Sequence, residues 1–352
     1  MPTTLFDKYT RLQLELDEDG VMLITLSNPG KLNATDATMH AELSTIFADI
    51  HSSPEVRAVV VTGEGKAFSA GGDLDWVAGQ LGNYERGVQT LREGGDIVRT
   101  MLECDTPIIS AINGVAVGAG LAVALMADIS IINEDCRFTD GHLRIGVAAG
   151  DHAVAIWPLL CGMAKAKYYL MTSDFIDGKE AERIGLVSKA VPADEVLPTA
   201  LELAHRFAIG PQEALRLTKR SLNYWLRPAL PYFEASLAYE VLNFFGPEAA
   251  EGINALREKR KPDYTRRRSI ATCRPIWPSR SSSPESPTTS RCPSTKNDRS
   301  TSPGRPTAPR SPKLIAKRNR RSVPRSRCAV PTTACSAKST AWSATSNQRG
   351  DG

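Results

Sequence analysis

Short apolar runs alternate with amphipathic stretches along the first half of the chain. Residues 12–16 and 21–26 flank a polar turn and predict a β-hairpin. Three further apolar runs are too short for helices, so we expect buried strands at residues 56–62, 108–112 and 129–132. Apolar residues recur at helical spacing between the strands and predict helices at residues 36–50, 85–103 and 121–127. This alternation indicates an α/β domain with buried strands.

The second half of the chain changes character twice. From Lys165 to Glu258 the pattern is nearly all helical, with prolines as interruptions. After residue 264 neither the helical nor the strand period is sustained. We therefore expect a core at residues 1–195, a helical part at residues 196–264 and a tail at residues 265–352.

The tail also differs from the rest in charge. The formal net charge of the chain is +4, but residues 265–352 hold 19 Lys and Arg against three acids, so the residues before them are acidic overall. The tail is rich in Ser and Pro and poor in large aliphatics, and we expect it to be disordered and outside the catalytic unit. Its basic clusters, Arg266–Arg268 and Lys317–Arg321, could neutralise phosphates. Neither zinc spacing nor an RNA-binding aromatic motif accompanies them, so nucleic acid is not the expected partner.

Cysteine spacing and hydropathy exclude several other classes. The sequence contains no C-x-x-C pair, so we predict neither a zinc site nor a disulfide framework, and we expect no bound metal. Residues 1–11 have no apolar signal segment. The uncharged stretch at residues 114–127 is too short to span a bilayer. These features predict a cytoplasmic protein without a membrane partner.

Two glycine-rich segments, Lys66–Asp73 and Asn113–Gly120, each follow a predicted strand and precede a predicted helix. Neither has the spacing of a P-loop or of a dinucleotide-binding fingerprint. Small residues let a backbone approach a ligand closely, and N–H groups at a helix start can point at that ligand. Two such loops can form an oxyanion hole, or they can serve only as tight strand–helix turns.

The order and content of these loops resemble the crotonase family, also called the enoyl-CoA hydratase/isomerase family. The resemblance rests on Ala67-Phe68-Ser69-Ala70-Gly71-Gly72-Asp73-Leu74, followed by residues 107–120, and it runs from about Leu12 to Tyr264. Further positions that fit the family are Asp128, Phe138, Ile145-Gly146-Val147, residues 181–187, Val191-Pro192 and residues 258–264.

The resemblance implies a spiral of ββα units followed by a helical C-terminal trimerisation part, assembled as a homotrimer or a dimer of trimers. The implied ligand is an acyl-CoA thioester, whose carbonyl oxygen would lie between the N–H groups of Gly72 and Ala119. CoA is then part of the substrate, and no separate cofactor is expected. The residues that match the CoA-binding segments of the family are Lys31, Leu32, Asn33, Ala34, Lys66, Ala70, Gly71 and Gly72.

The acid–base positions depart from the family pattern. Hydratases of the family use two glutamates, and Ala122 and His142 occupy those positions here. The nearest carboxylate is Asp151, which we expect to act as acid or base, with His142 as its orienting or proton-transferring partner. Both residues have structural alternatives. Asp151 could cap a helix that starts near residue 153, and His142 could be a hydrogen-bonded residue of the pocket wall.

A local likeness points to a different reaction. Asp140-Gly141, His142, Gly150-Asp151 and Trp157-Pro158 resemble the 6-oxocamphor hydrolases, retro-Claisen enzymes that do not use CoA. We therefore expect an enzyme of the enoyl-CoA hydratase/isomerase type that lacks the two-glutamate pair. The alternatives are C–C hydrolysis of a β-diketone and, in another class, a non-catalytic CoA- or nucleic-acid-binding protein.

Other polar and aromatic residues are expected to have structural roles. The helix at residues 234–251 carries carboxylates that we expect on a solvated face. The histidines expected in core, solvated or supporting positions are His40, His51, His152 and His205. The aromatic residues expected to pack against other side chains rather than to contact substrate are Trp157, Tyr224 and Trp225.

Overall fold

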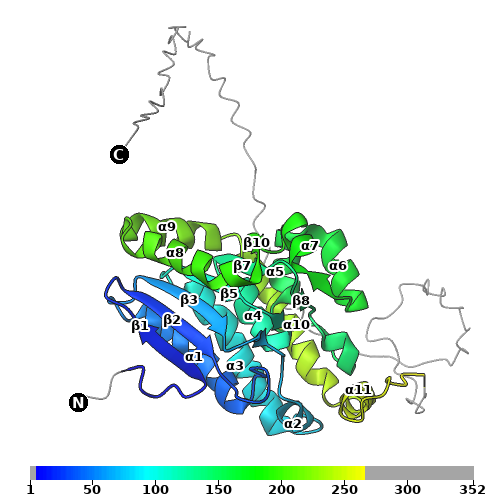
Figure 1. Ribbon diagram of the computed structural model, residues 1–352. Coiled ribbons are helices and arrows are strands. Elements are labelled where there is room, and N and C mark those ends of the chain that lie inside the picture. Colours follow the sequence, from blue (N-terminus) through cyan, green and yellow to red (C-terminus); the bar gives the residue numbers. More distant parts are fainter. Residues whose placement is uncertain (1–4, 266–352) are drawn as a thin grey trace, which may run out of the picture. The chain divides into compact units, whose positions relative to one another are not determined.

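A six-stranded sheet lies at the centre of residues 5–265, the part of the chain that the computed structural model describes (Figure 1). β1 pairs with β2 antiparallel, and all other neighbouring strands in the sheet are parallel. In spatial order the strands are β1 (Leu12–Leu16), β2 (Val21–Leu26), β3 (Ala58–Gly63), β5 (Ile108–Ile112), β7 (Ile129–Asn133) and β10 (Lys189–Val191).

The predicted hairpin is confirmed as β1–β2. Its register pairs Leu12 with Leu26 and Leu16 with Met22. The turn closes because Asp17 Oδ1 accepts a hydrogen bond from the Val21 N–H at 2.8 Å. Gly20 has a φ of 87°, a conformation that glycine adopts at little steric cost.

Helices cover both faces of the sheet, which explains why the central strands are continuous apolar runs. On one face, Val60 and Ile109 pack with the alanines of α8 (Val196–Ala208). On the other, Val59 and Val61 belong to the main core with α1 (Ala37–His51) and α3 (Tyr84–Glu103). Figure 1 shows α8 and α1 on these opposite faces. The predicted helices at residues 36–50 and 85–103 are therefore confirmed.

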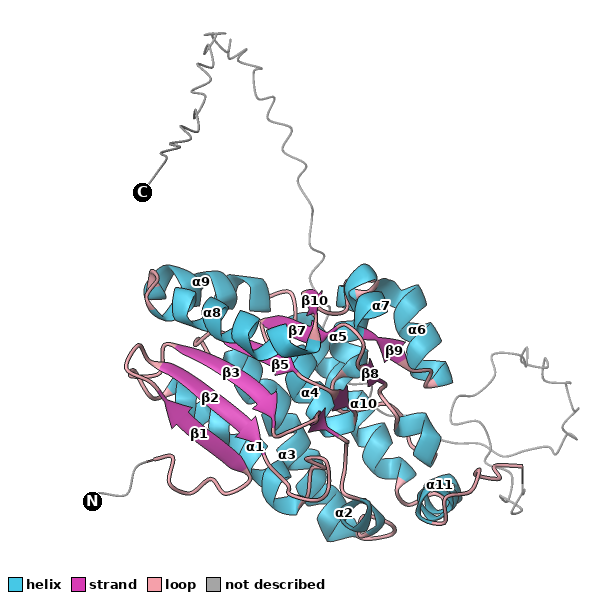
Figure 2. Cartoon of the chain, in the orientation of Figure 1, coloured by secondary structure: helices cyan, strands magenta, loops and turns pink. Residues whose placement is uncertain are grey.

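Smaller elements surround this sheet. A parallel pair joins β4 (Ala67–Ser69) to β6 (Val115–Ala116), and an antiparallel pair joins β8 (Arg137–Phe138) to β9 (Ile176–Asp177). Figure 2 shows β8 and β9 as short arrows away from the main sheet. The remaining α-helices are α2 (Leu74–Ala78), α4 (Gly118–Met126), α5 (Ala153–Leu160), α6 (Gly162–Thr172), α7 (Gly178–Arg183), α9 (Gln212–Asn223), α10 (Leu230–Asn243) and α11 (Pro247–Arg257).

The region after Lys165 is nearly all helical, as predicted, apart from the short strands β9 and β10, and β10 extends the main sheet by pairing with β7. One expectation about the second half is wrong. Tyr224 and Trp225 do not pack in the interior, since they are 60% and 77% exposed. Short strands and surface aromatics escape pattern analysis because neither leaves a periodic signal.

Residues 5–265 belong to one compact unit, and α8 packs directly on the sheet although it follows the predicted core boundary at residue 195. Within residues 5–265 no helix is both long and apolar enough to cross a lipid bilayer. The predicted basic tail lies outside the described residues, apart from Thr265 at its start.

Candidate active site

A cavity of about 910 Å³ is lined by the segments that directly follow β4, β6 and β8, and ligands commonly bind beyond the carboxyl ends of parallel strands such as β4 and β6. It brings together most of the residues singled out from the sequence. The predicted CoA-binding residues that line it are Lys31, Ala34, Ala70, Gly71 and Gly72. The predicted catalytic residues that line it, besides Gly72, are Ala119, His142 and Asp151.

The two glycine-rich loops lie side by side at this cavity. The β4–β6 pairing joins them, with Ala67 opposite Val115 and Ser69 opposite Ala116. A Cβ atom added to Gly71 would lie 3.2 Å from Val117 Cγ1, and one added to Gly118 would lie 4.0 Å from Gly72 N. Small residues therefore let the two backbones approach each other.

The main chain leaves N–H groups available in both loops. Thr35 forms a parallel bridge with Gly72. The Thr35 N–H donates to the Gly71 carbonyl, and the Thr35 carbonyl accepts from the Asp73 N–H. In a parallel bridge the N–H of the central residue, here Gly72, points away from the partner strand. Ala119 lies in the first turn of α4. The hydrogen bond from the Leu121 N–H to the Val117 carbonyl comes after it in the chain. N–H groups in the first turn of a helix have no partner within that helix.

A buried histidine with three carboxylate neighbours forms the polar side of the cavity. His142 begins a 3₁₀ turn, His142–Ile145, directly after Gly141, whose φ is 81°. Asp140 Oδ1 accepts hydrogen bonds from the main-chain N–H and from Nδ1 of His142, at 3.3 and 3.0 Å. The opposite ring nitrogen, Nε2, lies 4.0 Å from Asp151 Oδ2 and 3.5 Å from Glu240 Oε1.

Asp151 is held by a chain of hydrogen bonds rather than by a helix end. His152 Nδ1 lies 2.7 Å from Asp151 Oδ1, and the Trp157 indole N–H donates to His152 Nε2 at 3.2 Å. Because an indole N–H can only donate, the proton of His152 is on Nδ1 and is donated to Asp151. The N-cap residue of α5 is His152, so the capping alternative for Asp151 is wrong. Trp157 is fully buried, as expected.

Glu240 is the member of the cluster that the sequence analysis missed. It lies on α10, in the segment expected to be solvated, yet it is only 7% exposed and lines the cavity. Gly150 packs against it so closely that a Cβ there would lie 2.6 Å from Glu240 Cβ. The available signal was helical spacing, since Phe233, Ser236, Leu237 and Glu240 share the buried face of α10.

The cluster shifts the pKa of each of these groups. Burial lowers the pKa of His142, but the three carboxylates around it outweigh burial and hold the pKa well above its ordinary value. Burial raises the pKa of Asp151, but the neighbouring His152 and His142 lower it to about 2. Burial raises the pKa of Glu240, and His142 offsets this only in part. An ionised Asp151 therefore lies beside an imidazole whose protonated form is favoured.

Several carboxylate oxygens of the cluster have no hydrogen-bond partner within residues 5–265. They are the buried atoms Asp140 Oδ2, Asp151 Oδ2 and Glu240 Oε2. Buried polar atoms are normally hydrogen-bonded, so open acceptors at a cavity mark a place where a ligand, a water or a transferred proton can bind.

Comparison with known proteins then shows the family. The sequence model of the enoyl-CoA hydratase/isomerase family matches residues 17–267. The chain belongs to this family. A short-chain-enoyl-CoA hydratase of Clostridium acetobutylicum is 31% identical over 252 residues, which cover 70% of this chain and 95% of that protein.

Solved structures of family members agree with the fold. An enoyl-CoA hydratase/isomerase from Mycobacterium paratuberculosis superposes with a TM-score of 0.67 at 31% identity, covering 70% of this chain and 98% of that one. A β-diketone hydrolase from the cyanobacterium Anabaena, bound to (S)-3-oxocyclohexyl acetic acid, has a TM-score of 0.65 at 28% identity, covering 69% of this chain and 98% of that one. The resemblance stated from the sequence, and the α/β fold that it implied, are thus confirmed.

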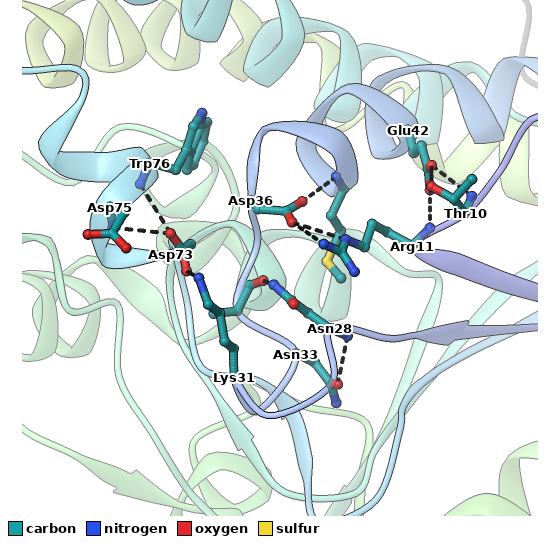
Figure 3. A network of polar contacts seen from close by, with 12 residues as sticks. Thr10, Arg11, Asn28, Lys31, Asn33, Asp36, Glu42, Asp73, Asp75 and Trp76 are labelled. Atoms are coloured by element: carbon teal, nitrogen blue, oxygen red, sulfur yellow. Dashed lines mark hydrogen bonds and ion pairs between the residues drawn. The ribbon is translucent and has the colours of Figure 1, made fainter.

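Three of the predicted CoA-binding residues do not line this cavity. Leu32 is 59% exposed, and Lys66 is exposed at the surface. The Asn33 side chain is buried and donates to the carbonyls of Glu64 and Ala67, both at 2.9 Å, so it fixes the first glycine-rich loop. Lys31 does line the cavity, and its ammonium donates to Asp73 Oδ2 at 2.5 Å, as Figure 3 shows.

One carboxylate–imidazole set within residues 5–265 has the spacing of a metal site. Ligand atoms of Asp140, His142 and Asp151 all lie within 4.8 Å of one another. Metal ligation requires a deprotonated imidazole nitrogen. The same carboxylates raise the pKa of His142 and so favour its protonated form. A cation held by these three ligands would have to displace that proton.

Proposed function

We propose that this member of the enoyl-CoA hydratase/isomerase family acts on an acyl-CoA thioester and stabilises an enolate. The observation that carries the proposal is that one cavity holds both glycine-rich loops and the buried histidine–carboxylate cluster. The thioester oxygen would accept hydrogen bonds from the N–H groups of Gly72 and Ala119. Removing one such donor typically costs about 2.7–4 kcal/mol of transition-state stabilisation.

The cluster supplies the proton transfer in this proposal. Asp151 is ionised, and its Oδ2 has no partner within the described chain, so it can accept a proton from the carbon next to the thioester. His142 and Glu240 lie beside it and can return a proton to another carbon. Moving a proton from one carbon to another needs only one set of groups that takes up the proton and returns it. Isomerisation therefore fits better than hydration by two glutamates, because the first glutamate position is Ala122.

Basic side chains at the cavity suit the phosphates of CoA. Lys31, Arg144 and Arg257 line the cavity and are exposed at its rim. Arg144 also stacks over the Phe175 ring, with Cζ at 4.6 Å from the ring centroid, which holds its guanidinium in place. These cations would bind the phosphates while the acyl group reaches the buried cluster.

The test is a panel of crotonyl-CoA, a 3-enoyl-CoA and a cyclic β-diketone, assayed with the full-length protein and with Asp151→Asn. We expect the protein to bind the CoA thioesters and to interconvert the double-bond isomers, with little conversion by the variant. Absence of binding to either thioester at high micromolar concentration in calorimetry would overturn the acyl-CoA proposal.

A second candidate is hydrolysis of a C–C bond in a β-diketone. It is favoured by the ionised Asp151, a carboxylate that can take a proton from water, and by the likeness to the β-diketone hydrolase. Water would add to one carbonyl, the adjacent C–C bond would break toward an enolate, and a proton would then go to the enolate carbon. In ¹⁸O-water this reaction would place one labelled oxygen in the new carboxylate. Labelled product from the cyclic β-diketone, without isomerisation of CoA thioesters, would favour this candidate.

We also infer that the chain assembles through its C-terminal helices as a homotrimer or a dimer of trimers. Large apolar side chains are exposed on and next to α9 and α10, and patches of this kind commonly mark interfaces. They include Leu217, Leu222, Trp225, Tyr239 and Leu242. Light scattering of the purified protein tests this inference, and a monomer at micromolar concentration would contradict it.

A further inference from the structure

A second polar wall lies in the same cavity, apart from the His142 cluster. His40 of α1, Gln80 after α2 and Thr90 of α3 all line the cavity and are 4%, 3% and 9% exposed. None of them belongs to the glycine-rich loops or to the proposed proton relay. We call these three residues the His40 wall.

The His40 wall has hydrogen-bonding groups that the protein does not use. Gln80 Oε1 is buried and has no partner within residues 5–265. His40 Nδ1 bonds to Glu93 Oε2 at 2.6 Å, and its Nε2 takes part in no hydrogen bond within the described chain. Native proteins leave few buried polar groups unpaired, so unpaired groups at a cavity wall indicate a ligand that pairs them.

The wall lies a short distance from the proposed oxyanion site. A Cβ on Gly72 would lie 3.7 Å from the six-membered ring of Trp76. The His40 ring also packs against Trp76, with ring centroids 4.9 Å apart and the ring planes tilted by 44°. Trp76 thus lies next to both Gly72 and His40, and the His40 wall lines the same cavity as the proposed oxyanion site, within reach of the acyl group of a bound thioester.

The charge around the cavity limits what can bind at the wall. Glu93 holds the His40 ring, and hydrogen bonds from His40 and Gln89 lower the Glu93 pKa against the effect of burial. Asp73, Asp140, Asp151 and Glu240 also line the cavity. The basic residues of the cavity, Lys31, Arg144 and Arg257, lie at its exposed rim, so a carboxylate at the buried wall would instead meet Glu93 and these acids. An uncharged oxygen on the ligand would not be repelled by these acids. The Gln80 amide can donate a hydrogen bond to a ketone, and it can donate to or accept from a hydroxyl.

We propose that the acyl group of the substrate carries a second, uncharged oxygen, a hydroxyl or a ketone, which hydrogen-bonds to His40 and Gln80. This proposal rests on the acyl-CoA assignment above and deepens it by naming the substrate class. Gln80 and His40 are then specificity residues that select an oxygenated acyl chain over a plain alkyl chain.

Calorimetry with the full-length protein tests this proposal with four thioesters of similar length: hexanoyl-CoA, 5-hydroxyhexanoyl-CoA, 5-oxohexanoyl-CoA and adipoyl-CoA. We expect the hydroxy or oxo thioester to bind roughly tenfold more tightly than hexanoyl-CoA. In Gln80→Met, which keeps the side-chain volume and removes the amide, this ratio should fall toward one. Thr90→Val removes a hydroxyl of the same wall that is not assigned to this oxygen, so it is the matched control and should keep the ratio.

The other outcomes separate the two proposals. Equal binding of hexanoyl-CoA and the oxygenated thioesters, or a ratio unchanged in Gln80→Met, would overturn the role of the His40 wall while the acyl-CoA function stands. Tightest binding of adipoyl-CoA would overturn the choice of an uncharged oxygen. Absence of binding to all four thioesters would overturn the acyl-CoA assignment and this proposal with it.

Discussion

Two groups of charged side chains in this protein differ in how completely they are satisfied. The Lys219 ammonium of α9 is buried, and it bonds to Asp128 Oδ2 at 2.7 Å and to the Thr106 carbonyl at 2.8 Å. The same Asp128 oxygen accepts from the Ile108 N–H at 2.8 Å, which ties the pair to β5. The His142 cluster instead keeps three buried carboxylate oxygens without a partner in the described chain.

This difference is what we expect if the Lys219–Asp128 pair stabilises the fold and the His142 cluster takes part in the proposed reaction. A buried ion pair gains enough to offset desolvation only when its remaining hydrogen-bonding atoms are also satisfied. The Lys219–Asp128 pair meets that condition and fastens α9 to the sheet. The His142 cluster does not meet it, and its residues line a cavity. We therefore expect substitutions in the first group to change stability and substitutions in the second to change turnover.

The largest effect is expected for Asp151→Asn. This change keeps the size of the side chain and an acceptor for His152, but it removes the general base, so kcat should fall by about 10²–10⁴-fold. The midpoint of urea unfolding should change little. Asp135→Asn, at an exposed carboxylate, is the control and should keep the turnover of the original protein. Full turnover in Asp151→Asn together with none in His142→Ala would reverse the roles assigned to the two residues.

Asp128→Asn should instead weaken the fold. The buried ammonium of Lys219 would lose its anionic partner, which should cost about 1–3 kcal/mol of unfolding free energy in urea titration. Turnover per folded molecule should be kept. The double variant with Lys219→Met removes the unpaired cation and should recover part of this loss. A large loss of turnover without a loss of stability would place Asp128 in the reactive group.

The pH dependence should sharpen the comparison further. His142 has a folded pKa above its ordinary value of about 6.5, so its contribution to stability is complete below that pH and is lost as the pH rises through the folded pKa. Glu240→Gln removes one of the carboxylates that raise this pKa. The alkaline limb of the kcat/KM profile should therefore move to lower pH. Glu234→Gln, at an exposed carboxylate on the same helix, should leave it in place.

The smallest effect is expected at an exposed pair. His205 Nε2 lies 2.8 Å from Asp17 Oδ2, and both side chains are 41% exposed. Solvent screens such pairs, so Asp17→Asn should change the unfolding free energy by less than about 1 kcal/mol. Asparagine keeps the oxygen that accepts from the Val21 N–H in the hairpin turn. If Asp17→Asn lowered the unfolding free energy as much as Asp128→Asn, burial would not explain the difference between the His205–Asp17 and Lys219–Asp128 pairs.

Much of the fold follows from local patterns. The β1–β2 hairpin, α1, α3 and the strands β5 and β7 lie close to the expected residues, because alternation and helical spacing are recorded in a few neighbouring positions. Both glycine-rich loops could also be recognised locally. The two backbones approach closely at small residues such as Gly71 and Gly118, and runs of small residues can be recognised in the sequence alone.

The rest of the site depends on packing between distant segments. Glu240 reaches His142 only because α10 packs against Gly150, and His40 reaches the cavity only beside Trp76. A glutamate on an amphipathic helix has the same local pattern whether it meets water or a buried imidazole. The exposure of aromatic residues such as Trp225 could not be predicted either, because an apolar residue in the sequence does not indicate whether another surface covers it.

Exchange of the carbon-bound proton tests the central claim most directly. A short-chain saturated acyl-CoA is incubated with the full-length protein in D₂O, and deuterium at the carbon next to the thioester is followed by NMR. If Gly72 and Ala119 stabilise an enolate and Asp151 removes the proton, deuterium should enter at this carbon, and at least about 100-fold more slowly with Asp151→Asn. A thioester that binds but gains no deuterium, or that exchanges equally fast in the variant, would contradict the account.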